Sequence, residues 1–129
     1  MRTLRAVLSM AIACVTATCG GGGGGNPGGP SPGDNPNQMT ISAAGVLSPK
    51  ELVVSPGSRV LITNNHSERH NVTSDPHPEH NDCPEINQVG LLSSGQRRET
   101  GNLVTVRTCG IHDHDDPDNA NLRARIIIR

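Results

Sequence analysis

The chain has 129 residues, a length that allows one modest domain with extensions. Its formal net charge is −1 and it contains no Phe, Tyr or Trp. It therefore offers neither a basic surface nor aromatic platforms for nucleic acid, and we expect no nucleic-acid partner. Aliphatic side chains must build the core. Six histidines are many for this length, and they all fall in two windows, 66–80 and 112–114.

Residues 1–19 have the features of a bacterial export signal. Arg2 and Arg5 give a positive start, and the apolar run that follows is shorter than the roughly 20 residues that span a membrane. Residues 20–38 are rich in Gly and Pro, a composition that predicts a disordered tether.

A signal that ends at a cysteine and continues into a flexible tether resembles a bacterial lipoprotein. The resemblance implies that Cys19 is lipidated and becomes the first residue of the mature protein, with Cys14 as the competing processing site. Cleavage without lipid attachment is the alternative. We therefore expect an exported protein, anchored to a membrane of the bacterial cell envelope and facing the periplasm or the exterior.

Residues 39–129 carry a β pattern and are expected to form one domain. Val60 and Ile62 alternate with Leu61, as in a strand with one buried face. The last segment alternates most clearly, and its inward positions are Leu122, Ala124, Ile126 and Ile128. The expected strands are 51–54, 58–64, 70–74, 89–92, 103–108 and 122–129. Short strands separated by Pro and Gly, without a sustained helical period, predict an all-β sandwich.

The loop 75–87 is long for such a domain. It carries His77, His80 and Cys83, together with three prolines that limit its freedom. Long ordered loops are usually functional. The segments His77-Pro-Glu-His80 and His112-Asp-His114 are dense in imidazole and carboxylate, which suits zinc or Cu(II).

An ordered series of short motifs resembles the plastocyanin-like branch of the cupredoxins over about residues 40–129. The series is Ser55-Pro-Gly-Ser-Arg-Val-Leu-Ile-Thr-Asn64, His70-Asn-Val72, Leu92-Ser-Ser-Gly-Gln96, Cys109-Gly-Ile-His112 and a final strand. The resemblance implies a Greek-key β-sandwich with one copper ion at one end, held by His70, Cys109 and His112. It also implies that Asn71 forms a hydrogen bond near the sulfur. A thiolate with two imidazoles is a ligand set that suits copper.

Two features depart from this family. The usual axial Met position holds Pro117, so an axial ligand would have to come from Asp113, His114, Asp115 or a backbone carbonyl. The second departure is Cys83. Once Cys14 is removed and Cys19 is lipidated, only Cys83 and Cys109 remain, and two thiols in a small exported domain often pair.

Three hypotheses follow, none of them an enzyme. The first is a membrane-anchored copper protein that carries single electrons to an unknown partner. The second is a metal-binding or metal-delivery module with a Cys83–Cys109 disulfide. Its copper or zinc would lie among the imidazoles of His70, His77, His80, His112 and His114. The third is a metal-free structural or interaction domain.

Overall fold

The computed structural model describes residues 35–129. The expected signal, Cys14 and Cys19 lie outside these residues. The described part includes the last residues of the expected tether, of which Gln38 opens the first strand. Within residues 35–129, no helix has the length and apolar character needed to cross a membrane.

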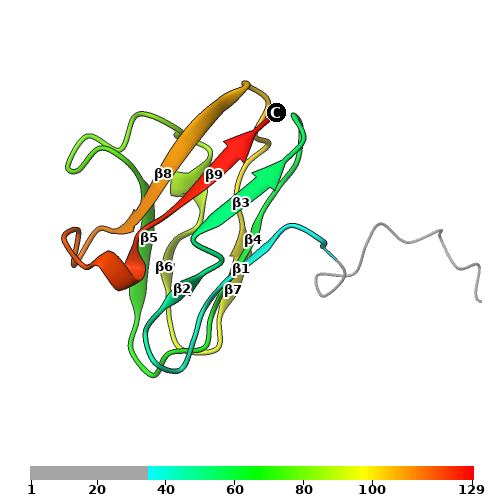
Figure 1. Ribbon diagram of the computed structural model, residues 1–129. Helices are drawn as coiled ribbons and strands as arrows, with labels where there is room; N and C mark the ends of the chain where they lie inside the picture. Colours follow the sequence, from blue (N-terminus) through cyan, green and yellow to red (C-terminus); the bar gives the residue numbers. More distant parts are fainter. Residues whose placement is uncertain (1–34) are drawn as a thin grey trace, which may run out of the picture.

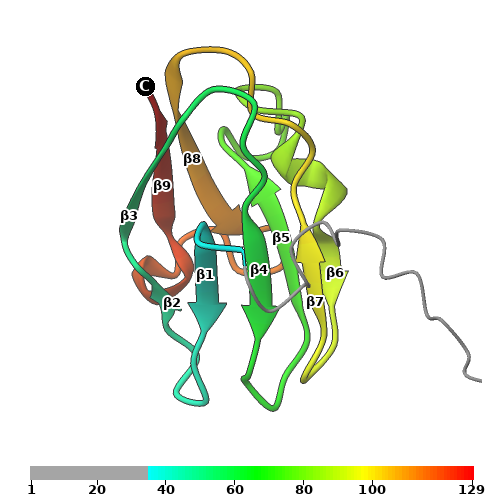
Figure 2. The ribbon, with the colours of Figure 1, turned by 90° about the vertical axis from the view of Figure 1, so that its right-hand side faces the viewer.

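The described residues fold into two sheets, seen from perpendicular directions in Figures 1 and 2. The first sheet has the order β2-β1-β4-β7 and the second has the order β3-β9-β8-β5-β6. The strands are β1 (Gln38–Ile41), β2 (Leu47–Ser48), β3 (Glu51–Val54), β4 (Leu61–Asn64), β5 (His70–Ser74), β6 (Gly90–Leu92), β7 (Arg97–Glu99), β8 (Arg107–Asp113) and β9 (Ala124–Ile128). Two short 3-10 turns, η1 (Ile86–Gln88) and η2 (Ala120–Leu122), complete the described part.

Both sheets are mixed. β1 pairs with β4 in parallel and β3 pairs with β9 in parallel, whereas the other pairs are antiparallel. The chain passes from the first sheet to the second between β2 and β3, so these two consecutive strands lie in different layers. The expected all-β sandwich is therefore confirmed.

Aliphatic side chains fill the space between the sheets, as the absence of aromatic residues requires. Ile126 and Ile128 are buried while Arg125 and Arg129 are exposed, which confirms the alternation expected for the last strand. Leu61 is only 3% exposed although it alternates with Val60 and Ile62. The chain is therefore buried on both sides at this point, more deeply than the alternation predicted.

The segment 103–108 differs from its expected strand. Leu103 is buried and forms one isolated bridge with Ser58, but the regular strand β8 begins only at Arg107. Val104 and Val106 are 59% and 67% exposed, so their apolar alternation marks no buried face. β7 was not expected at all, because its sequence Arg97-Arg-Glu99 has no apolar period; it forms an edge of the first sheet.

The strands β5 and β8 are neighbours in the second sheet and carry most of the chemistry. Their register places Thr73 opposite His112 and Val72 opposite Asp113. After β5 the chain leaves the sheet in the long loop and returns through η1. A disulfide between Cys83 of this loop and Cys109 of β8, with a Cα–Cα distance of 5.8 Å, fixes the loop to the strand.

Candidate metal centre

The alternation of β8 and β5 separates the histidines expected to share one copper ion. On β8, Cys109 and Ile111 point into the core, so His112 lies on the opposite face of the sheet. His70 lies on the core side of β5, where its ring meets Asp113. His70 and His112 therefore belong to two different clusters.

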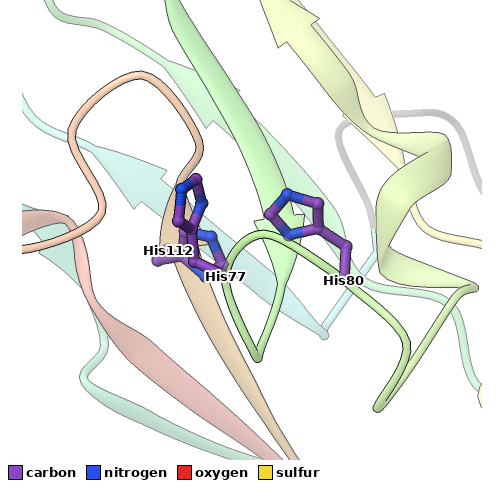
Figure 3. Close-up of side chains that lie close together, drawn as sticks. All are labelled: His77, His80 and His112. Carbon is purple, nitrogen blue, oxygen red and sulfur yellow. The ribbon is translucent and has the colours of Figure 1, made fainter.

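The outer cluster consists of His77, His80, His112 and His114. Its ring centroids lie 4.8–5.6 Å apart in the five contacting pairs. Figure 3 shows three of the rings, with His77 and His80 coming from the long loop and His112 from β8. One ligand nitrogen from each of these three lies within 4.8 Å of the others, which makes the trio a candidate metal site.

Asp75 orients the buried ring of His112. The Nδ1–H of His112 donates to Asp75 Oδ1 at 2.7 Å, so Nε2 carries the lone pair and accepts a longer bond of 3.3 Å from the Thr73 hydroxyl. Asp75 reaches this position because Gly110 has no side chain, and a Cβ there would overlap Asp75 Oδ2. Burial lowers the pKa of His112 below its ordinary value of 6.5, and the hydrogen bond that His112 donates to Asp75 offsets part of this effect.

His80 is held just as firmly. Its Nδ1–H donates to the carbonyl oxygen of Ser74 at 2.9 Å, and its Nε2 meets His114 Nδ1 at 2.8 Å. Its backbone has a φ of 52°, a left-handed conformation that is uncommon for a residue with a side chain. The Ser74 hydroxyl and the Asn87 amide both donate to its carbonyl oxygen and hold that conformation.

The outer cluster thus has the features of an imidazole metal site. Histidines that bind metals usually donate their second ring N–H to a carboxylate or a backbone carbonyl, which fixes the tautomer. His112 does this with Asp75, and His80 does it with Ser74. His77 is exposed and His112 is buried, so the cluster reaches from solvent to the surface of the sheet.

The inner cluster is a hydrogen-bonded chain of Asp113, His70 and His66. The Nδ1–H of His70 donates to Asp113 Oδ2 at 2.6 Å, and its Nε2 meets His66 Nδ1 at 2.9 Å. Asp113 Oδ1 accepts the backbone N–H groups of Asn71 at 3.0 Å and Asp115 at 3.1 Å. Both nitrogens of His70 are therefore occupied within the chain.

The thiolate copper site implied by the resemblance does not fit this arrangement. Cys109 is bonded to Cys83 and both are buried in the core, so Cys109 offers no thiolate while the disulfide is intact. Asn71 was expected to form a hydrogen bond near the sulfur, and its backbone N–H donates to Asp113. Of the expected axial candidates, Asp113 bonds His70 and His114 bonds His80. A Cys83–Cys109 disulfide was the alternative to thiolate ligation that we expected from the sequence.

The sequence did not reveal several residues that shape the two clusters. Asp75 and Gly110 are separated by 35 positions, and only the packing of the loop on β8 brings them together. His66 belonged to a recognised histidine window, but its partner was not foreseen. A carboxylate two positions before His77 was the available signal for Asp75.

Comparison with known proteins shows similarity in fold alone. No family model matches the chain, and no curated protein matches it in sequence. Among solved structures, a purple cupredoxin from Nitrosopumilus maritimus has a TM-score of 0.55 at 20% identity, covering 71% of this chain and 98% of that one. The oxidised plastocyanin of Dryopteris crassirhizoma has a TM-score of 0.55 at 18% identity, covering 71% and 99%. An oxidised amicyanin mutant has a TM-score of 0.54 at 18% identity, covering 71% and 80%. The chain therefore has a cupredoxin-like fold.

Proposed function

We propose that this cupredoxin-like domain is a metal-binding module that holds one copper ion between His77, His80 and His112. The observation that carries the proposal is the convergence of three imidazole nitrogens within 4.8 Å. Two of these rings are already oriented by oxygen acceptors at their other nitrogen. The residues present therefore fit a divalent ion bound by nitrogen.

Copper is the favoured ion. Imidazole suits both zinc and copper, but a given nitrogen site binds Cu(II) more tightly than Zn(II). The cavity beside the trio also contains the carboxylates of Asp75 and Asp118, which favour a cation. Bound copper would supply a Lewis acid that can also change its charge by one electron. The exposed His77 gives a metal-exchange partner access to the ion.

The test is metal loading of the purified protein with its disulfide intact. Cu(II) is added, free thiols are counted, and the visible and electron paramagnetic resonance spectra are recorded. We expect no free thiols from Cys83 and Cys109, one bound copper, and nitrogen ligation without an intense sulfur-to-copper band. His77→Ala, which changes an exposed side chain, should weaken copper binding at least tenfold. His66→Ala in the inner cluster should leave it unchanged.

Two results would refute the proposal. Absence of copper binding by the folded protein would favour a metal-free structural or interaction domain. Equal copper affinity in the parent and in His77→Ala would place the ion elsewhere.

Single-electron transfer is the second candidate function. It is favoured by the similarity in fold to plastocyanin and amicyanin, which have been solved in oxidised and reduced forms. A thiolate copper site would require reduced Cys109, and an intense band that appears on copper loading after reduction and disappears in Cys109→Ser would support it. The redox partner would be a separate protein.

Location at a membrane is part of the proposal. It rests on the signal-like residues 1–19 and on Cys19. Mass spectrometry of the protein from an expressing bacterium should find a lipid on Cys19, and Cys19→Ser should release the protein from the membrane fraction. Lipid retained in Cys19→Ser but lost in Cys14→Ser would assign processing to Cys14.

A further inference from the structure

A cavity of about 420 Å³ opens beside the outer cluster. His77 and His112, two of the three proposed copper ligands, form part of its wall. Arg123, Asp118 and Asp75 also line it. The proposed ion would therefore face an open, solvent-accessible hollow that carries charged groups.

The guanidinium of Arg123 has N–H donors available for a ligand in this cavity. Its Nη2 lies 3.7 Å from Asp75 Oδ2, a separation longer than a hydrogen bond, and its side chain is 51% exposed. The other carboxylate oxygen of Asp75, Oδ1, accepts the hydrogen bond from His112, so the carboxylate is already oriented by that ring. The guanidinium is thus placed next to the cluster without being fully engaged by it.

The charges of the cavity depend on the metal. Asp75 and Asp118 oppose one arginine, which leaves a formal charge of −1 in the cavity when no ion is bound. A divalent ion at the imidazoles changes this to +1. An anion is therefore favoured only after the metal has bound, and a single negative charge is enough to balance the site.

We infer that the copper site takes a small carboxylate anion as an external ligand, held between the ion and Arg123. The inference rests on the proposed function. Sites with three protein ligands keep a further position open for water or another ligand. The planar guanidinium offers paired N–H groups that match the two oxygens of a carboxylate. The structure thus assigns Arg123 a role in ligand selection.

The experiment uses the copper-loaded full-length protein and acetate as the probe. Acetate is titrated at constant ionic strength, kept with sodium perchlorate, while the copper absorption and paramagnetic resonance spectra are recorded. We expect a saturable spectral change in the parent. Arg123→Ala should weaken acetate binding about tenfold, as expected for the loss of a charge-assisted hydrogen bond. Arg123→Lys keeps the charge but loses the paired geometry, and it should fall between the two.

Arg125 provides the matched control. It is also on the outer face and pairs with Glu51, but it does not line this cavity. Arg125→Ala should therefore bind acetate as the parent does. The copper content of each variant is measured in the same samples, so a change in metal loading is not read as a change in acetate binding.

Each contrary outcome has a distinct meaning. If copper binds but acetate leaves the spectra unchanged, the site has no open position and the inference is wrong while the proposed function stands. If acetate binds equally to the parent and to Arg123→Ala, Arg123 has no role in the site and the inference is wrong. If the parent binds no copper, the proposed function fails and the inference fails with it.

Discussion

The two histidine clusters lie on opposite faces of one sheet and are built from the same kinds of residue. In the outer cluster, oxygen acceptors hold the Nδ1–H groups of His80 and His112, while Nε2 of His80 meets His114 and Nε2 of His112 accepts only the longer bond from Thr73. In the inner cluster, a carboxylate and a second imidazole occupy both nitrogens of His70. Histidine content alone therefore does not identify a metal site, because among the described residues only the outer cluster brings three ligand nitrogens within 4.8 Å of one another.

The aspartates of the two clusters differ in the same way. Asp113 is only 5% exposed and its oxygens bond two backbone N–H groups and an imidazole, so it belongs to the framework of the domain. Asp75 is 27% exposed and lies in the cavity wall beside His112. We expect substitution of Asp113 to affect folding and substitution of Asp75 to affect metal binding.

The largest effect is expected from removing the disulfide that joins the loop of the outer cluster to β8. The double variant Cys83→Ala, Cys109→Ala loses a disulfide across a separation of 26 residues. Loss of its restraint on the unfolded chain should lower the free energy of unfolding by about 3.5 kcal/mol. Urea denaturation of the parent and the double variant measures this difference. A difference below about 1 kcal/mol would show that the loop is fixed to the sheet mainly by its other contacts.

Asp113→Ala should destabilise the protein almost as strongly. It leaves His70 and two backbone N–H groups without their acceptor in a buried region, at a cost of about 3 kcal/mol. The same variant should bind copper with the parent's affinity under conditions in which it is folded. Denaturation and copper titration of one preparation test both expectations, and loss of copper binding by the folded variant would show that the two clusters act as one site.

We expect Asp75→Asn, in contrast to Asp113→Ala, to affect copper binding rather than stability. Loss of the carboxylate charge at His112 Nδ1 should weaken copper binding about 10- to 100-fold, because a neutral amide holds the ring less firmly and no longer raises the basicity of Nε2. Asp118→Asn is the control, since it removes the same charge from the same cavity wall. Equal losses in the two variants would mean that charge, rather than orientation of the ring, determines the affinity.

The smallest expected effect concerns pH. The pKa of His112 is lowered in the folded protein, so the unfolded chain binds a proton at higher pH than the folded chain does. The stability that this histidine contributes is present above about pH 6.5 and is lost as the pH falls from there towards the lowered pKa, by about 1 kcal/mol or less in the first unit. His112→Gln should have a shallower fall in unfolding free energy over this range. A parallel fall in both proteins would assign the effect to other groups.

The sequence was most informative where apolar alternation coincides with a buried face. Ile126 and Ile128 marked the last strand correctly for this reason. The pattern was misleading at Val104 and Val106, which alternate but face solvent, and it was silent at β7, whose charged residues form an edge. A periodic pattern of apolar side chains indicates a buried face. It therefore cannot indicate a strand whose side chains stay exposed while its backbone pairs with a neighbour.

The candidate site was only partly predictable for a related reason. His77, His80, His112 and His114 were all recognised as possible ligands, and the Cys83–Cys109 pair was recognised as a possible disulfide. The spacing Cys109-x-x-His112 nevertheless suggested one shared copper ion with His70. The strand β8 decides otherwise, because it runs regularly from Arg107 to Asp113 and its alternation sends Cys109 and His112 to opposite faces. How far a strand extends depends on its pairing with distant strands and is not visible in local spacing.

The strand β7 has a consequence for how the protein behaves at high concentration. A strand at the edge of a sheet presents unpaired backbone groups to which a strand of another molecule can add. In β7 these groups are flanked by Arg97, Arg98 and Glu99, with both arginines exposed. A second copy of the chain that paired there in parallel and in register would bring like charges together. This edge therefore resists parallel stacking into fibres, a useful property for a domain whose described residues form a core without aromatic side chains.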